Sequence, residues 1–196
     1  MRICPTCGEE NADRARFCQN CATPLTETER LLEVRKVVTI VFADVTGFRA
    51  GVEQWGALGE TGFNSTMTAL LASALCDLGR FEEAEANAHR SRELSADDDF
   101  ASQAAWRTAQ ARVLSHRGEH DEALRLADEA LAINESTDYL TWQGESDEVG
   151  GMVLAAAART DEALEAYGRA IERLERKGVV PAVERVRARI AELLGE

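Results

Sequence analysis

Three stretches of the chain, LGRFEEAE (78–85), RGEHDEAL (117–124) and ARTDEALE (158–165), share one pattern: a short turn that leads into a helix. Their alanines, Ala84, Ala123 and Ala163, are 39 and 40 residues apart. A recurrence at this period is typical of arrays of helix pairs, in which each pair buries its apolar face against the next. The stretches therefore predict a mainly α-helical fold built from about three stacked units.

Each unit shares further positions around the turn. A small residue is followed three positions later by leucine, then by the turn, by an alanine, and by another small residue seven positions beyond it. Small residues at fixed places let two antiparallel helices approach closely, and leucine fills the space between them. The positions that we expect to pack the helices are Ala72, Leu75, Gly79, Ala84, Ala111, Leu114, Gly118, Ala123, Ala130, Gly151, Leu154, Ala163 and Ala170.

This pattern resembles the tetratricopeptide repeat, with its W-x2-L-G-x2-Y … G … A-x3-F-x2-A consensus. The units are about five residues longer than the standard ~34 and lack the late proline, and Ala158 stands where Gly79 and Gly118 mark the turn. We interpret the extra length as longer first helices. The resemblance implies a helical-repeat solenoid over residues 63–196, in which Pro181 begins a closing helix. The helices expected are 64–78, 81–95, 99–117, 120–134, 138–158, 161–177 and 180–194.

The N-terminal residues have a different composition, dominated by two cysteine pairs in CPTCG (4–8) and CQNC (18–21). The spacing C-x2-C-x10-C-x2-C predicts two tight turns that place four thiolates around one cation, which suits tetrahedral Zn²⁺. A closed shell of four protein ligands leaves no position for a catalytic water. About 25 residues cannot form an adequate apolar core, so metal binding would supply the folding energy. We predict a zinc ribbon over residues 1–25 with the ligands Cys4, Cys7, Cys18 and Cys21.

Two alternatives for these cysteines stay open, four unligated thiols in a disordered segment and an iron–sulfur cluster. Gly8 suits the backbone turn that follows the first pair, whereas Ala22 stands at the corresponding place after the second pair. The fifth cysteine, Cys76, lies on a predicted helix beside Leu75 and is expected to be a buried structural thiol.

Charge is unevenly distributed along the chain, whose net charge is −13. Residues 1–50 hold seven basic and seven acidic side chains, whereas residues 51–196 hold fifteen basic and 28 acidic ones. An acidic surface repels phosphate backbones, so we do not expect the helical part to bind nucleic acid. An alternative in which Arg2, Arg14 and Arg16 let the ribbon contact nucleic acid stays open.

No apolar run reaches the roughly 18–20 residues that span a bilayer, and Met1–Arg2–Ile3 does not begin a signal peptide. We therefore expect a cytoplasmic protein without membrane contact. In that reducing compartment four clustered cysteines favour metal over disulfides.

The stretch RKVVTIVFADVTGF (35–48) resembles the opening of class III adenylate/guanylate cyclase domains, in which an apolar strand ends in F-x-D-[IV]-x-G-[FS]. The resemblance implies that Asp44 and the carbonyl of Val45 correspond to ligands of the catalytic Mg²⁺ or Mn²⁺. The ribbon segment 8–25 and the repeats at 98–137 resemble the two ends of large bacterial regulators. Those proteins join a zinc ribbon, a cyclase domain, an ATPase module and C-terminal tetratricopeptide-like repeats.

The middle of such a regulator is not visible in this sequence. After Gly47 no second metal-binding aspartate or transition-state pair can be recognised, and no G-x4-G-K-[ST] loop exists. We interpret the chain as an internally deleted relative without enzymatic activity. Asp44 is then a carboxylate that ends a strand, a possible vestige of the metal site together with Val45.

Three segments connect these parts. Residues 26–34 read as a linker, residues 35–48 as the remnant of the first cyclase strand, and residues 49–62, with four glycines and no clear period, as a junction. An isolated apolar strand leaves backbone groups unpaired, so residues 36–43 are a candidate surface for self-association. Gly150–Gly151 either permits close contact between helices or interrupts one.

The favoured function is a non-catalytic module that binds zinc and holds a protein or peptide partner in the repeat groove, in bacterial signalling or transcriptional regulation. The main alternative is a cyclase-related protein with residual metal–nucleotide binding at Asp44. A reading frame that has decayed and lost its function is a further alternative.

Overall fold

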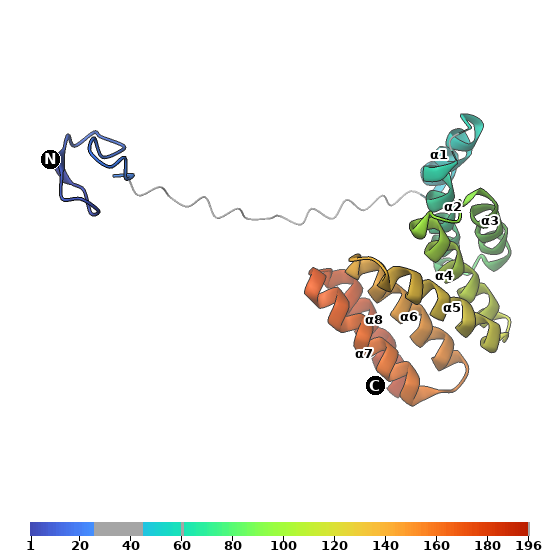
Figure 1. Ribbon diagram of the computed structural model, residues 1–196. Helices are drawn as coiled ribbons and strands as arrows, with labels where there is room; N and C mark the ends of the chain where they lie inside the picture. Colours follow the sequence, from blue (N-terminus) through green and yellow to red (C-terminus); the bar gives the residue numbers. More distant parts are fainter. Residues whose placement is uncertain (26–44, 60, 196) are drawn as a thin grey trace. The chain divides into compact units, whose positions relative to one another are not determined.

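The computed structural model describes residues 1–25, 45–59 and 61–195 (Figure 1). These residues form two compact units, a ribbon near the N-terminus and an array of helices. The predicted linker 26–34 and most of the predicted cyclase-like segment 35–48, including its apolar strand, lie outside the described residues. Self-association through residues 36–43 therefore stays a prediction.

The ribbon contains two short strands that pair antiparallel, β1 (Arg2–Ile3) and β2 (Glu10–Asn11). A second pairing, the isolated bridge between Phe17 and Pro24, closes the other half of the ribbon. Each half surrounds one cysteine pair. The ribbon thus has little regular structure, as expected of a module that a metal ion stabilises.

The helical array consists of first and second helices in alternation, as the repeats predict (Figure 1). Every helix end of the three units and the closing helix lies within two residues of its expected place. The mainly α, tetratricopeptide-like fold behind a small ribbon is therefore confirmed. The helices are α2 (Gly62–Asp77), α3 (Phe81–Leu94), α4 (Phe100–His116), α5 (His120–Glu135), α6 (Leu140–Ala156), α7 (Thr160–Lys177) and α8 (Val180–Leu194).

The segment before the first unit differs from the expectation. We predicted the end of a strand at 45–48 and a junction without regular structure at 49–62, but α1 (Val45–Ala57) is a helix. It packs against α2, and Val52 is buried. A glycine inside a helix costs only about 1 kcal/mol relative to alanine, so packing of an apolar side chain can outweigh it.

The turns within the three units are built alike. Leu75, Leu114 and Leu154 each accept, through the main-chain oxygen, a backbone hydrogen bond from the residue five positions later, at 2.9–3.0 Å. A second bond crosses each turn from the residue at the glycine position, which is in the left-handed region. This paired arrangement satisfies the last carbonyl groups of a helix and fixes where it ends. The shared turn therefore sets the angle at which each second helix returns.

The core follows the stacking of the helices. One cluster of buried side chains joins α4, α5 and α6 and contains Trp106, Leu126 and Val153, whereas a second joins α7 and α8 around Leu174 and Val186. The first helices α2, α4 and α6 pack in sequence beside one another. None of the helices in the described part of the chain is long and apolar enough to cross a bilayer.

The glycine pair in α6 does not interrupt the helix. A Cβ atom on Gly151 would lie 2.5 Å from Cε1 of Tyr167 on α7, whereas one on Gly150 would meet nothing within 4 Å. Gly144, two turns earlier, faces Leu174 in the same way, at 2.8 Å. Of the two possibilities for this pair, Gly151 therefore fits close contact between helices, and Gly150 faces open space.

Candidate metal centre and interaction grooves

The ribbon brings its four cysteine sulfur atoms together. All four lie within 4.8 Å of one another; Sγ of Cys4 and of Cys21 are 3.5 Å apart, and Sγ of Cys7 and of Cys18 are 3.6 Å apart. A tetrahedral ion with bonds of about 2.3 Å to sulfur requires sulfur–sulfur separations of about 3.8 Å. The four thiols therefore form a cluster that could bind one metal ion.

The backbone shapes both cysteine pairs in the same way. The amide of Gly8 donates to the carbonyl of Cys4 at 3.0 Å, and the amide of Ala22 donates to the carbonyl of Cys18 at 2.9 Å. Both Gly8 and Ala22 have positive φ, 75° and 58°. Ala22 thus takes the conformation that glycine adopts after the first pair, although a Cβ atom makes it less favourable.

Hydrogen bonds favour the thiolate forms of Cys4 and Cys18. Burial alone raises the pKa of Cys4, but the backbone amides of Cys7 and Thr6 and the Cys21 thiol lower it to about 6. The backbone amide of Cys21 is the main cause of the lowered pKa of Cys18. For Cys7 the amide of Glu9 acts to lower the pKa, but the neighbouring thiols outweigh it and raise the pKa to about 11. A cation would remove this competition among the sulfurs, because thiolate is the form that binds metal.

Side chains around the cluster hold the second cysteine pair. Asn11, which is 3% exposed, accepts from the amide of Gln19 at 2.9 Å and donates to the carbonyl of Glu9 at 2.8 Å. Its amide nitrogen also lies 3.7 Å from Sγ of Cys18. Such hydrogen bonds around a metal centre orient the ligands. This role of Asn11 could not be predicted from the sequence, because a single asparagine carries no spacing signal.

The helical array has small hollows between its first helices. Two adjoining pockets, of about 50 and 190 Å³, share the lining residues Leu70, Ser73, Thr108 and Glu145 from α2, α4 and α6. We call this surface the first-helix groove and define it by those four residues. Its wider part also includes Met152 and arginines from α8.

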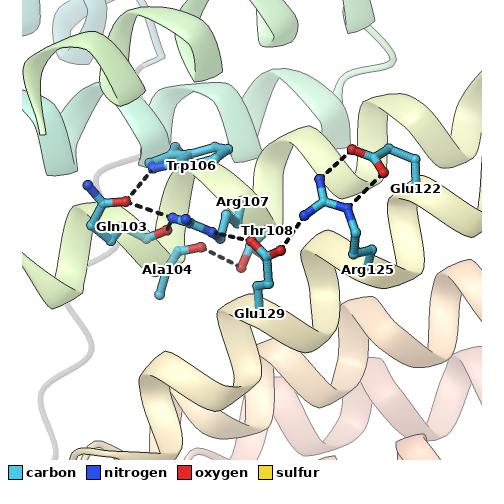
Figure 2. A network of polar contacts seen from close by, with 8 residues as sticks. All are labelled: Gln103, Ala104, Trp106, Arg107, Thr108, Glu122, Arg125 and Glu129. Atoms are coloured by element: carbon cyan, nitrogen blue, oxygen red, sulfur yellow. Dashed lines mark hydrogen bonds and ion pairs between the residues drawn. The ribbon is translucent and has the colours of Figure 1, made fainter. Parts of the chain in front are cut away.

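A separate and larger pocket, of about 540 Å³, lies between α3, α4 and α5. The guanidinium carbons of Arg107 and Arg92 lie 4.2 and 5.1 Å from the centroid of the Trp106 ring. Figure 2 shows Arg107 between Trp106 and Glu129; its Nε donates to Glu129 at 2.9 Å. Glu129 also pairs with Arg125. Charges on this wall therefore largely neutralise one another, and the network ties α4 to α5.

Two consecutive acids of α6 are buried and paired with arginines. Asp147, whose side chain has no exposed surface, lies 2.9 Å from Nε of Arg169 and 3.2 Å from Nε of Arg173. Burial raises the pKa of Asp147, and the two arginines only partly oppose this effect.

Glu148, the next residue, pairs with Arg185 at 2.6 Å and with Arg189 at 2.9 Å on α8. Burial again acts to raise its pKa, but here the hydrogen bonds from the arginines prevail and hold the pKa of Glu148 below its ordinary value. Neither Asp147 nor Glu148 was predicted from the sequence. The run Ser146–Val149, in which polar residues occupy positions of the helical period that face the core, is the signal that could have identified them.

Most of the expected packing residues lie in the core of the array. The alanines of the set are buried together with Leu75, Leu114 and Gly151, Leu154 is half-buried, and Gly79 and Gly118 lie exposed in the turns. Cys76 is 5% exposed and its Sγ lies 3.9 Å from the carbonyl oxygen of Ala109, as a structural thiol would.

The candidate nucleotide-binding residues Asp44 and Val45 stay a prediction. Asp44 lies outside the described residues, and Val45 begins α1. Among the described residues, the cysteine cluster is the candidate set of metal ligands. Of the histidines, His116 stacks on Phe81 with ring centroids 3.7 Å apart, and His89 lies 4.0 Å from Glu85.

Comparison with known families supports both units. The model of a tetratricopeptide repeat family matches residues 65–136, and that of a zinc-ribbon domain matches residues 3–25. No curated protein and no solved structure matches the chain. Neither matching family is a cyclase or an ATPase, so these findings give no support to the cyclase and ATPase parts of the resemblance or to an internal deletion. Zinc-ribbon and tetratricopeptide domains are in general non-catalytic, and together they indicate a metal-binding and protein-interaction module.

Proposed function

We propose that the protein is a non-catalytic adaptor of bacterial signalling or transcriptional regulation, whose ribbon binds Zn²⁺ and whose helical array holds a peptide segment of a partner protein. We also propose the cytoplasm as its location, because the reducing conditions there keep clustered cysteines available to a metal. We propose that residues 1–25 bind the metal and that residues 63–196 bind the partner, as the domain boundaries predicted from the sequence imply.

The observation that carries this proposal is the geometry of the four sulfur atoms. Their spacing matches a tetrahedral ion with four thiolate ligands, an arrangement in which zinc is structural and has no open position for substrate. The pockets between the first helices support a binding groove there, because repeat stacks commonly bind peptides on such a surface. The metal ion would thus stabilise the ribbon, while the helical array binds the partner peptide.

Metal analysis of the purified full-length chain tests the first half. We expect one zinc per chain, and we expect Cys18→Ser to lose it because three thiolates bind the ion far more weakly than four. Cys76→Ser is the matched control, since that thiol belongs to the helical core, and it should keep the zinc. Absence of zinc from the wild-type protein, or visible absorption of an iron–sulfur cluster, would contradict this half.

Selection from a random peptide library on the full-length chain tests the second half. Selected peptides should lose binding to Leu70→Arg, because Leu70 is 40% exposed in the first-helix groove. They should retain it with Leu194→Arg, which changes a leucine that is 50% exposed at the end of α8. Failure to select any peptide, or equal effects of the two variants, would contradict a peptide-binding groove. Formation of cyclic nucleotide from ATP or GTP by the purified protein would contradict the non-catalytic assignment.

A further inference from the structure

The narrow end of the first-helix groove is a pocket of about 50 Å³ between α2, α4 and α6. That volume holds roughly three to five water-sized groups, so it admits the end of one side chain but no aromatic base. Part of its wall is apolar, from Leu70, Ala104, Ala105 and the ring-bearing residue Trp142. The rest is polar and rich in hydrogen-bond acceptors, namely Thr66, Thr108, Asn134, Glu145 and Ser146.

Asn134 presents an acceptor that has no donor. The residue is 4% exposed, and its Nδ2 donates to the carbonyl of Trp142 at 3.2 Å and to Oγ of Ser146 at 2.9 Å. These two bonds fix the orientation of the side-chain amide. Its Oδ1 is buried and accepts no hydrogen bond from any described residue. Because an unsatisfied buried acceptor is unfavourable, a ligand that brings a donor to this atom would be stabilised.

Glu145 adds a negative charge that no arginine among the described residues contacts directly. Asp147 and Glu148 on the same helix each pair with two arginines, whereas Glu145 forms no hydrogen bond or ion pair with the rest of the described chain. It lines both parts of the groove and is half-buried. Burial raises its pKa, although Arg185 acts in the opposite direction. A cation placed in the pocket would relieve the loss of hydration that this carboxylate suffers.

The surrounding charge points to the same kind of ligand. Residues 51–196 carry 28 acidic and fifteen basic side chains, and such an excess attracts basic partners and accelerates their encounter. Lysine suits the pocket better than arginine does, because its compact ammonium group has three donors on a flexible apolar stem, whereas a guanidinium is a broad planar fork. We propose that this pocket takes the ammonium end of a lysine side chain from the bound peptide, with Glu145 and Asn134 as its acceptors.

This inference rests on the proposed function, since it names the side chain by which a bound peptide is held. The test uses nuclear magnetic resonance of the isotopically labelled full-length chain, titrated with Nα-acetyl-lysine amide. The matched probes are the norleucine analogue, which lacks the ammonium group, the Nε-acetylated lysine analogue, which lacks the charge, and the arginine analogue. Signals to follow are the side-chain amide of Asn134 and the indole of Trp142, both at the pocket.

We expect the lysine probe to shift both signals and the other three probes to leave them unchanged at the same concentration. Glu145→Gln should weaken binding of the lysine probe about tenfold or more, because it removes a charged hydrogen-bond acceptor but keeps the shape of the side chain. Glu165→Gln, an exposed position on α7, should bind the probe as the wild type does.

Equal shifts with the norleucine probe would overturn the proposal, since the pocket would then be merely apolar. Equal or tighter binding of the arginine probe would overturn the assignment to lysine, and an unchanged affinity of Glu145→Gln would remove the role of that carboxylate. These outcomes are separable from the fate of the proposed function. Library peptides that bind the groove without any lysine would sink this inference alone, whereas failure to select peptides would remove the adaptor function itself.

Discussion

The second and third units of the array, residues 100–135 and 140–177, show how one repeat pattern tolerates opposite chemistry. With the interval of 40 residues between them, Arg107 corresponds to Asp147 and Glu129 to Arg169. Both pairs join the first helix of a unit to its second helix at 2.9 Å, but the charges are reversed. These two units thus both have an ion pair at this site, with opposite polarity.

The neighbouring residue accounts for the polarity. In the second unit Trp106 precedes the arginine, whose guanidinium carbon lies 4.2 Å from the indole centroid, and arginine can make this contact whereas an acid cannot. The corresponding residue of the third unit is Ser146, which offers no ring. There the acid is buried between Arg169 and Arg173 instead. The presence or absence of this one aromatic residue therefore correlates with which helix carries the arginine and which carries the acid.

The second and third units also differ at a pair of packing residues, one on each helix. The second unit has Ala111 on its first helix and Ala127 on its second, in one buried cluster. The corresponding residues of the third unit are Gly151 and Tyr167, where the absent Cβ atom makes room for the phenol ring. The missing methyl group on the first helix lets the larger phenol ring of the second helix pack closely against it, as close packing requires.

The largest difference between the units should come from removing the acid of each pair. Asp147→Ala is expected to destabilise the array by about 3 kcal/mol or more, because it leaves two arginines facing a buried site. Glu129→Ala should cost at most about 1 kcal/mol, since the Glu129 side chain is 39% exposed and water can replace it. Urea unfolding of the full-length variants measures both. Equal decreases in the free energy of unfolding would show that burial of the ion pair does not determine its contribution to stability.

Packing at the glycine pair should give effects of opposite sign. Gly151→Ala is expected to destabilise by about 1–3 kcal/mol, because its methyl group would collide with Tyr167. Gly150→Ala places the same group in open space one position earlier and should stabilise the helix by about 0.5–1 kcal/mol. Thermal unfolding of the two variants and the wild type tests whether the two changes in stability have opposite signs. If both variants gained stability, the close approach of α6 and α7 would be wrong.

The pairing of Glu148 should make the stability of the third unit depend on pH. Although burial alone acts to raise it, hydrogen bonds from Arg185 and Arg189 hold the pKa of Glu148 below 4.5. A lowered pKa in the folded state gives stability that is present above pH 4.5 and is lost as the pH falls through the folded-state value. The corresponding residue of the second unit, Thr108, does not titrate in this range.

Glu148→Gln should therefore be less stable than the wild type by about 1–2 kcal/mol near neutral pH, and the difference should shrink on acidification below pH 4.5. Unfolding curves of both proteins across this range provide the measurement. Glu165→Gln, exposed on α7, serves as the control. A difference that stays constant with pH would mean that the two arginines do not stabilise the charge.

Sequence reasoning recovered most of the array, because leucine and the small residues occur where the helical period and the turn both require them. The three turns share their hydrogen bonds, so a pattern found in one unit fixed the others. It also indicated the cysteine cluster, since C-x2-C spacing alone brings two sulfur atoms together.

It could not recover contacts that depend on which residue a second helix brings to the first. The pairing of Asp147 with Arg169 and Arg173, the seat of Tyr167 on Gly151 and the lone acceptor of Asn134 each join residues on different helices. The helix at Val45–Ala57 was missed for a related reason. Its glycines argue against a helix locally, and only its packing against α2 outweighs them.

The smallest expected effect concerns the one unit whose turn lacks glycine. Gly118 in the second unit has φ 81° with open space around it, whereas Ala158 at the corresponding place has φ 58°. The left-handed conformation is unfavourable for a residue with a Cβ atom, so Ala158→Gly should stabilise the third unit by about 0.5–1 kcal/mol, less the extra entropy of glycine in the unfolded chain. Gly118→Ala should lose a similar amount through the backbone alone, because its methyl group would touch nothing. Thermal unfolding of the two variants should shift in opposite directions, and a loss of stability in Ala158→Gly would mean that the alanine is held there by packing rather than tolerated.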